Sequence, residues 1–244
     1  MDKIPLEQQG EECPIRFRDC FSVRYIQSAA LLCRMGFSLE QDYRAAPDVP
    51  QEVILRHEAF ILNSILSSVY FLESTINELY ADASDEAYFF ADEKHEALLR
   101  EISDRWTNEK NFDRAPILTK YQKILTLAGK SPFDEGDQAF ANIRDLIEIR
   151  NYLLHYKREW VVLGGEKAPR PEETTGVRFE KSLRKKFAIN PIAAAGLPFF
   201  PDKCLGHGCA EWAVVNSIIF TDEFFRRLDL PAPYEGVRGE MVTR

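Results

Sequence analysis

The chain has 244 residues, of which 45% are apolar and 29% charged, and its formal net charge is −8. This composition excludes a disordered chain and a fibrous protein, and the length suffices for a buried core without disulfide or metal support. Five cysteines are an odd and sparse set for this length, so a disulfide framework is not expected. The net negative charge argues against extensive non-specific binding of nucleic acid, but it is compatible with a local phosphate-binding site.

The sequence predicts a cytoplasmic protein without a membrane span. The longest uncharged run within a helical pattern covers residues 59–72, which is shorter than the roughly 20 residues that a transmembrane helix needs. Residues 1–13 contain acidic side chains where a signal peptide needs an apolar run. We therefore expect neither membrane insertion nor secretion.

Helical periodicity dominates the sequence, because apolar residues recur three and four positions apart. The first predicted helix covers residues 21–36, and Asp48-Val49-Pro50 then breaks the chain. A long amphipathic helix is predicted over residues 51–80. Strand character is limited to a weak alternation at residues 159–163. The remaining predicted helices cover residues 93–108, 116–128, 136–157, 177–187 and 209–228.

The predicted fold is all-α, an antiparallel helical bundle of four to five main helices. An N-terminal extension is assigned to residues 1–49, the bundle to residues 50–230 and a C-terminal tail to residues 231–244. The Pro- and Gly-rich stretch at residues 190–208 forms an irregular loop before the last helix. No internal repeat is visible.

Two charged residues fall on apolar helix faces. At 100° per residue, Arg150 lies in the middle of the apolar arc of the 136–157 helix. Glu73 lies in the middle of the apolar arc of the 51–80 helix. Because an unpaired buried charge costs several kcal/mol, we predict that Arg150 pairs with Glu73, with Glu58 as a less central candidate. Such a pair is either a structural salt bridge or part of a functional site.

The residues after Arg150 favour a site. Asn151 follows directly and His155 stands one helical turn beyond Asn151. Histidine exchanges protons near pH 7, and arginine matches phosphate oxygens bidentately. Arg150 and His155 are about 140° apart around a straight helix. They converge only if the helix distorts, if the arginine side chain reaches round, or if a second copy of the chain supplies one of them.

The pattern Arg150-Asn151-x-x-x-His155 resembles the motif of the HEPN superfamily, the "higher eukaryote and prokaryote nucleotide-binding" domains. In that motif a histidine follows an arginine after four to six residues, often with a polar residue behind the arginine. The resemblance extends over about residues 51–228. It implies a dimerising helical bundle and, in many members, metal-independent RNA cleavage in bacterial stress response or defence.

The resemblance also implies roles for three residues. His155 would be the general base that activates a ribose 2′-hydroxyl. Arg150 would hold the scissile phosphate, and Asn151 would orient the phosphate or the His155 ring. Cleavage would leave a 2′,3′-cyclic phosphate, and no cofactor is expected.

The chain also departs from the family pattern. One toxin subfamily has a tyrosine two residues after the histidine, where a partner nucleotidyltransferase modifies it, but Lys157 stands there in this chain. We therefore do not predict that partner or that modification. A protein antitoxin of unknown kind is left as an alternative partner. Because many family members are inactive, the alternative is a non-catalytic homodimeric module that binds a nucleotide, RNA or a protein.

A basic segment at residues 178–186 holds five bases and one acid. Such a segment is either a solvated helix face or a guide for a polyanion. The RNA-binding residues predicted on the second interpretation are Arg178, Lys181, Arg184, Lys185 and Lys186.

Cys204, His207 and Cys209 bring metal-ligating residue types close together. A structural zinc site normally uses two pairs of such ligands, and the sequence has no second pair. We therefore predict no metal, and a Gly-rich turn with Cys209 packed as a small apolar residue. His57 and His95 are predicted to lie on the surface.

Overall fold

The computed structural model describes residues 19–84, 93–108, 112–158 and 175–244. Three short helical turns are η1 (Phe112–Arg114), η2 (Phe199–Lys203) and η3 (Glu235–Glu240). These described residues contain no strand, so the all-α class is confirmed for them. The weak strand pattern at residues 159–163 lies outside the described residues. The α-helices are α1 (Phe21–Tyr43), α2 (Gln51–Ser84), α3 (Glu93–Asn108), α4 (Ile117–Leu127), α5 (Gln138–Leu154), α6 (Thr175–Leu183) and α7 (His207–Leu228).

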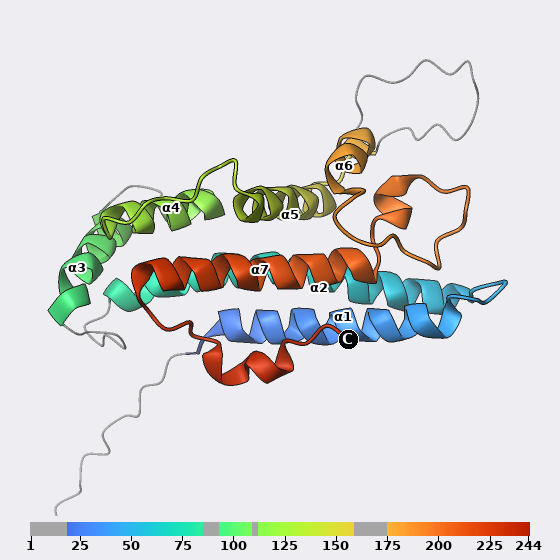
Figure 1. Ribbon diagram of the computed structural model, residues 1–244, viewed down its shortest axis with the longest axis horizontal. Helices are drawn as coiled ribbons and strands as arrows, with labels where there is room; N and C mark the ends of the chain where they lie inside the picture. Colours follow the sequence, from blue (N-terminus) through green and yellow to red (C-terminus); the bar gives the residue numbers. More distant parts are fainter. Residues whose placement is uncertain (1–18, 85–92, 109–111, 159–174) are drawn as a thin grey trace, which may run out of the picture.

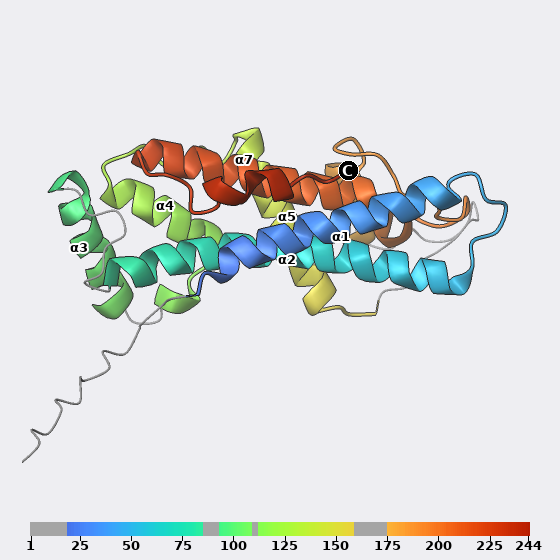
Figure 2. The same cartoon turned by 90° about the horizontal axis from the view of Figure 1, so that it is seen from below.

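Helix α2 is the central element of the fold, because it contacts α1, α3, α4, α5 and α7. Figure 1 shows that α1 runs antiparallel to α2 and α7, whereas α2 and α7 run in the same direction. Helix α5 crosses these long helices, as Figure 2 shows. Helix α3 lies at one end of α2, and the loop before α7 lies at the other end.

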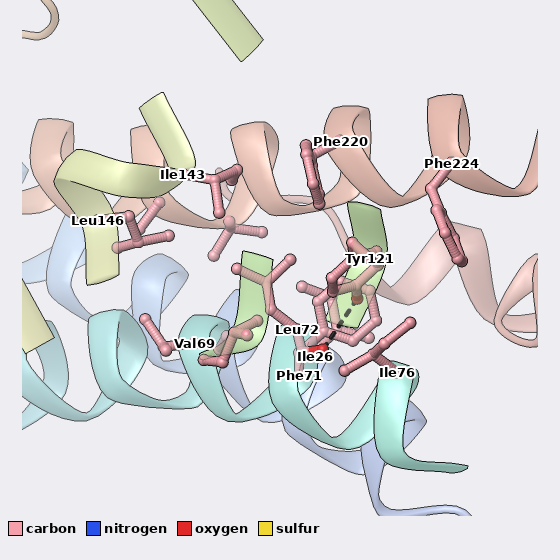
Figure 3. Close-up of a cluster of buried hydrophobic side chains, with 14 of the residues drawn as sticks. Ile26, Val69, Phe71, Leu72, Ile76, Tyr121, Ile143, Leu146, Phe220 and Phe224 are labelled. Atoms are coloured by element: carbon pink, nitrogen blue, oxygen red, sulfur yellow. Dashed lines mark hydrogen bonds between the residues drawn. The ribbon is translucent and has the colours of Figure 1, made fainter. Parts of the chain in front are cut away.

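The hydrophobic core lies between α2 and α7 and is closed by side chains of α1, α4 and α5 (Figure 3). Tyr121 of α4 is fully buried in it. Its hydroxyl donates a hydrogen bond of 2.8 Å to the Leu72 carbonyl. Its ring packs edge-on against Phe220 and Phe224, at centroid distances of 5.1 and 4.7 Å. This packing holds α4 between the two central helices and satisfies the one polar atom of the tyrosine side chain.

Helix α1 is part of this core, although its residues fall in the segment predicted to be an N-terminal extension. Ile26 and Cys33 are fully buried among the core residues. The helix continues through Gly36 to Tyr43, seven residues beyond the predicted end. A Cβ at position 36 would lie 2.5 Å from the Ile61 Cδ1 atom of α2, so the glycine lets the two helices approach closely. Only residues 19–49 of the predicted extension are described.

Most other helix boundaries agree with the periodicity to within a few residues. The helix predicted over residues 93–108 has these bounds in the structure, and the helix predicted over residues 136–157 covers residues 138–154. The basic helix is shorter than predicted, because α6 ends at Leu183. The last helix begins at His207, two residues earlier than predicted.

The C-terminal segment packs back onto α1 rather than extending from the fold (Figure 1). Asp229 ends α7 in the left-handed conformation with φ of 62°, and the Leu230 N–H bonds the Phe225 carbonyl at 3.1 Å. This arrangement turns the chain sharply at a helix end. The Arg34 guanidinium of α1 then donates to the carbonyl oxygens of Glu240 (3.1 Å) and Val242 (2.5 Å).

The end of α7 is joined to the loop between α4 and α5 by an arginine. Arg227 donates to the Ser131 and Pro132 carbonyls at 2.9 and 3.1 Å. Its guanidinium also lies 4.3 Å from the centre of the Phe133 ring. The Glu223 carboxylate accepts from Arg227 at 2.8 Å, so it fixes the arginine in this position.

Stability should depend on the ionisation of Glu223 in acid. The hydrogen bonds from Arg226 and then Arg227 lower the pKa of Glu223 from 4.5 to about 2. A carboxyl with a lowered folded-state pKa stabilises fully above its unfolded pKa and loses this contribution as the pH falls through the folded pKa. We expect Glu223→Gln to be less stable than wild type at pH 6, with the difference shrinking between pH 4.5 and 2. Urea unfolding across this range measures it, and a constant difference would contradict the assignment.

The length and composition of helix α2 are relevant to the prediction that the chain has no membrane span. Within the described residues, Gln51–Ser84 is long and apolar enough to cross a membrane by length and composition, with a mean hydropathy of 1.4 in its most apolar window. Half of that window is buried inside the protein. The core helix of a soluble protein has the same property, and α2 occupies the centre of this fold. The cytoplasmic location stays a prediction.

Candidate functional site

Arg150 and Glu73 form the ion pair that their helical positions predict. Arg150 Nη2 lies 2.7 Å from Glu73 Oε2, joining α5 to α2. The Arg150 side chain is 18% exposed and that of Glu73 is 39% exposed. Arg150 Nη1 also donates to Asn151 Oδ1 at 2.9 Å. Two sides of the guanidinium are therefore fixed, while Arg150 Nε is buried and has no hydrogen-bond partner among the described residues.

The pair lines a surface hollow of about 320 Å³. Besides Glu73 and Arg150, the charged residues that line the hollow are Arg114, Arg144 and Glu148. Three arginines against two glutamates leave one excess positive charge. The full lining consists of Glu73, Arg114, Ala115, Pro116, Ile117, Leu118, Arg144, Ile147, Glu148, Arg150 and Asn151.

Arg114 and Arg144 are the residues that sequence reasoning missed. Arg144 lies seven positions before Asn151, which places both on one face of α5. It is exposed and has no ion-pair partner among the described residues. Arg114 ends η1, three positions before the start of α4, and lies 3.9 Å from Asp113. The spacing of Arg144 and Asn151 shows in the sequence that both lie on one face of their helix. Arg114 could not be found in this way, because only the tertiary fold brings it close to α5.

His155 does not lie in the hollow with Arg150. Helix α5 ends at Leu154, and His155 follows as the residue that closes the helix, with its N–H bonded to the Asn151 carbonyl at 2.9 Å. The His155 side chain is exposed. Among the described residues it forms no hydrogen bond or ion pair. The structure thus brings Arg150, Asn151 and Glu73 together and leaves His155 open to solvent just after the end of α5.

The predicted RNA-binding residues are divided between internal contacts and the surface. Lys186 Nζ lies 2.7 Å from Asp145 Oδ2 and 2.7 Å from Asn142 Oδ1, so it joins the loop after α6 to α5. Arg178 lies 3.5 Å from Glu148, a residue of the hollow.

The other three basic residues have exposed side chains. Arg184 lies 3.2 Å from Glu180 on α6 and 5.6 Å from the centre of the Phe199 ring. Lys181 and Lys185 are exposed. Lys186 is therefore held by internal contacts, whereas Arg178 connects the basic segment to the hollow.

Cys204, His207 and Cys209 pack at the start of α7. Both thiols are fully buried, and the hydrogen bond between them, together with burial, raises the pKa of Cys209 well above its usual value. The His207 ring lies 4.6 Å from the Phe37 ring, and its Nε2 is 3.2 Å from the Thr243 carbonyl. In the part of the chain that the structure describes, no three His, Cys, Asp or Glu residues are grouped to hold a metal.

His57 is a buried residue, so its predicted surface position is wrong. Its side chain is 2% exposed, and its Nε2 lies 2.8 Å from Glu40 Oε1. The same oxygen accepts the backbone N–H of His207 at 2.6 Å. The cluster joins α1, α2 and the first residue of α7. The side chain of His95 lies outside the described residues.

Comparison with protein-family models, curated proteins and solved structures finds no match. No family is therefore assigned to this chain. The HEPN resemblance rests on Arg150-Asn151-x-x-x-His155.

Proposed function

We propose that this protein is a HEPN-like, metal-independent endoribonuclease of bacterial stress response or defence, and that it acts in the cytoplasm as a homodimer. The proposal assigns residues 50–230 to a HEPN-like bundle. The supporting observation is the fixed Arg150 guanidinium, which lines a hollow with two further arginines. A guanidinium held in place binds phosphate oxygens without reorganising during the reaction.

Each residue has a defined part in the proposed reaction. His155 takes the proton of a ribose 2′-hydroxyl, whose oxygen then attacks the adjacent phosphorus. The bond from phosphorus to the 5′-oxygen breaks, and the leaving oxygen takes a proton from an acid or water. The products are a 2′,3′-cyclic phosphate and a 5′-hydroxyl. Arg150 and Arg144 offset the negative charge that grows on the phosphate.

A second copy of the chain is part of this proposal. Arg150 lies in the hollow, whereas His155 lies outside it at the end of α5. A two-fold axis near this end of α5 would bring His155 of one copy to the Arg150 hollow of the other. The basic residues Arg178, Lys181, Arg184 and Lys185 would then extend the RNA path beside the hollow.

Labelled RNA incubated with the protein in EDTA tests the proposal. We expect wild type to cleave and to leave cyclic-phosphate ends, and His155→Ala to be slower by roughly 10²–10⁴-fold, the usual contribution of a general base. Lys157→Ala is the matched control, because Lys157 is also exposed beyond α5 and has no assigned role. All variants are first shown to have equal folding and oligomeric state. Equal cleavage by wild type and His155→Ala would contradict the role of His155.

The second candidate function is a non-catalytic dimeric module for a nucleotide, RNA or a protein. The observation in its favour is that Arg150 already has partners within one copy, Glu73 and Asn151, while His155 lies apart. RNA binding without cleavage, equal in wild type and His155→Ala, would favour this candidate over the nuclease.

A further inference from the structure

A second and larger pocket lies where the α1–α2 loop, the start of α2, the end of α5 and the loop before α7 meet. Its volume is about 670 Å³, which is within the range of about 300–1,000 Å³ for small-molecule sites. The lining consists of Tyr43, Arg44, Ala46, Pro47, Asp48, Val49, Ile54, His57, Glu58, Ile61, Leu62, Tyr152, Leu153, Tyr156, Asn190, Pro191, Ile192, Ala193, Ala194, Leu197, Pro201, Asp202 and Leu205.

The loop that forms one wall is fixed by Asn190. This residue is 9% exposed, and its side-chain amide donates to the carbonyls of Asp202 (3.2 Å) and Leu205 (3.4 Å). Its Oδ1 accepts the N–H of Ile192 at 3.1 Å. These hydrogen bonds hold the wall of the pocket in place.

His57 is a buried polar group in the lining of the pocket. Glu40 Oε1 accepts the backbone N–H of His207, so it is an acceptor, and it lies 2.8 Å from His57 Nε2. Nε2 is therefore the ring nitrogen that carries the proton toward Glu40. In a neutral imidazole this leaves Nδ1 as a hydrogen-bond acceptor.

The Nδ1 atom of His57 has no hydrogen-bond partner among the described residues. The His57 side chain is 2% exposed, and it lines the pocket. The pocket thus holds an oriented acceptor whose tautomer is set by Glu40.

The other lining residues indicate the polarity and the charge of a ligand that would fit the pocket. Three tyrosines and many aliphatic and proline side chains provide an apolar, aromatic wall. The charged groups are three carboxylates, those of Asp48, Glu58 and Asp202, and one guanidinium, that of Arg44. This excess of negative charge favours a neutral or cationic ligand over an anion.

We propose that this pocket binds a neutral or cationic aromatic small molecule whose N–H or O–H group donates a hydrogen bond to His57 Nδ1. This site is separate from the Arg150 hollow, since the two linings share no residue. The proposal does not depend on nuclease activity.

Titration calorimetry with indole and 1-methylindole tests the site. The two probes differ in the N–H donor, which 1-methylindole lacks. We expect indole to bind saturably with one site per chain and 1-methylindole to bind at least about tenfold more weakly, the usual effect of one hydrogen bond to a buried group. Equal affinity of the two probes, or no saturable binding of indole, would overturn the proposal.

His57→Gln assigns the effect to the residue. The amide nitrogen of the substituted side chain reaches the place of Nε2 and keeps the hydrogen bond to Glu40, but the side chain lacks the Nδ1 acceptor. We expect the substitution to weaken indole binding about tenfold and to leave the affinity for 1-methylindole unchanged. A double-mutant cycle that combines the change in the protein with the change in the ligand measures their coupling. His155→Gln, at the exposed histidine, is the matched control and should bind as wild type. An unchanged indole affinity in His57→Gln would overturn the assignment.

Two charged derivatives test the electrostatic part of the proposal. Tryptamine carries a cation and indole-3-acetate carries an anion on the same ring. Tighter binding of tryptamine supports the proposed selectivity, whereas tighter binding of indole-3-acetate contradicts it.

Discussion

Replacing Glu40 by Ala is expected to lower the free energy of unfolding by about 2–6 kcal/mol, because two buried donors lose their acceptor at a usual cost of about 1–3 kcal/mol each. The Glu40 side chain is buried, and one of its oxygens serves both His57 Nε2 and the His207 N–H. Without it, two buried donors lose their acceptor. Gly206, which precedes α7, has no side chain to replace it as the cap of the helix.

Thermal unfolding followed by circular dichroism measures this effect. For a domain of this size the expected loss corresponds to a fall in Tm on the order of 10 °C. Glu40→Gln is the matched control, because its amide oxygen still accepts a hydrogen bond while the charge is lost. We expect Glu40→Gln to be intermediate. A Tm for Glu40→Ala within about 2 °C of wild type, well below the shift expected for a lost buried pair, would contradict the structural role of the cluster.

Replacing Gly208 by Ala should destabilise the fold by about 3 kcal/mol, at the upper end of ordinary overpacking. A Cβ at this position would lie 2.3 Å from the Ala188 carbonyl oxygen and 3.0 Å from the Ala188 nitrogen. Both atoms belong to the backbone, so a rotamer change cannot relieve the contact. The loop before α7 would have to move away from the helix.

Gly36→Ala provides the comparison for Gly208→Ala. Its Cβ would meet the Ile61 side chain, with the closest contact at the terminal Cδ1, and this flexible end can turn away. Alanine also gains about 0.5–1 kcal/mol over glycine within a helix. We therefore expect Gly36→Ala to lose clearly less stability than Gly208→Ala in urea unfolding, although the buried Ile61 side chain has to shift. Equal destabilisation by the two variants would show that backbone contact at Ala188 is not the cause.

Periodicity predicted the positions of the helices well, because each amphipathic helix shows its buried face in its own sequence. It failed at the end of α1, where the helix passes through Gly36. A glycine inside a helix is tolerated where another helix approaches closely, and that neighbour, Ile61 of α2, is not visible in the local sequence. The predicted extension ends at the break before residue 51, where the family resemblance begins, and it therefore includes α1, although α1 belongs to the core.

The candidate site shows the same limit of local information. The Arg150–Glu73 pair could be predicted because each charge interrupts an apolar arc on its own helix. The Glu40–His57 pair could not, since these residues lie near helix ends, where polar side chains are usual. The tertiary fold buries them by placing the start of α7 against both, and the contact between Glu40 and His207 spans 167 positions.

The separation of 167 positions between Glu40 and His207 determines the order in which their contacts form during synthesis. Helices α1 and α2 are consecutive and leave the ribosome together, so they can pair as a hairpin with Glu40 facing His57. His207 follows Glu40 by 167 residues, which takes roughly 10–30 s at translation rates of about 5–20 residues per second. During that time the apolar face of the α1–α2 hairpin that α7 later covers is exposed. The Glu40 carboxylate has His57 as a partner but still lacks the His207 N–H.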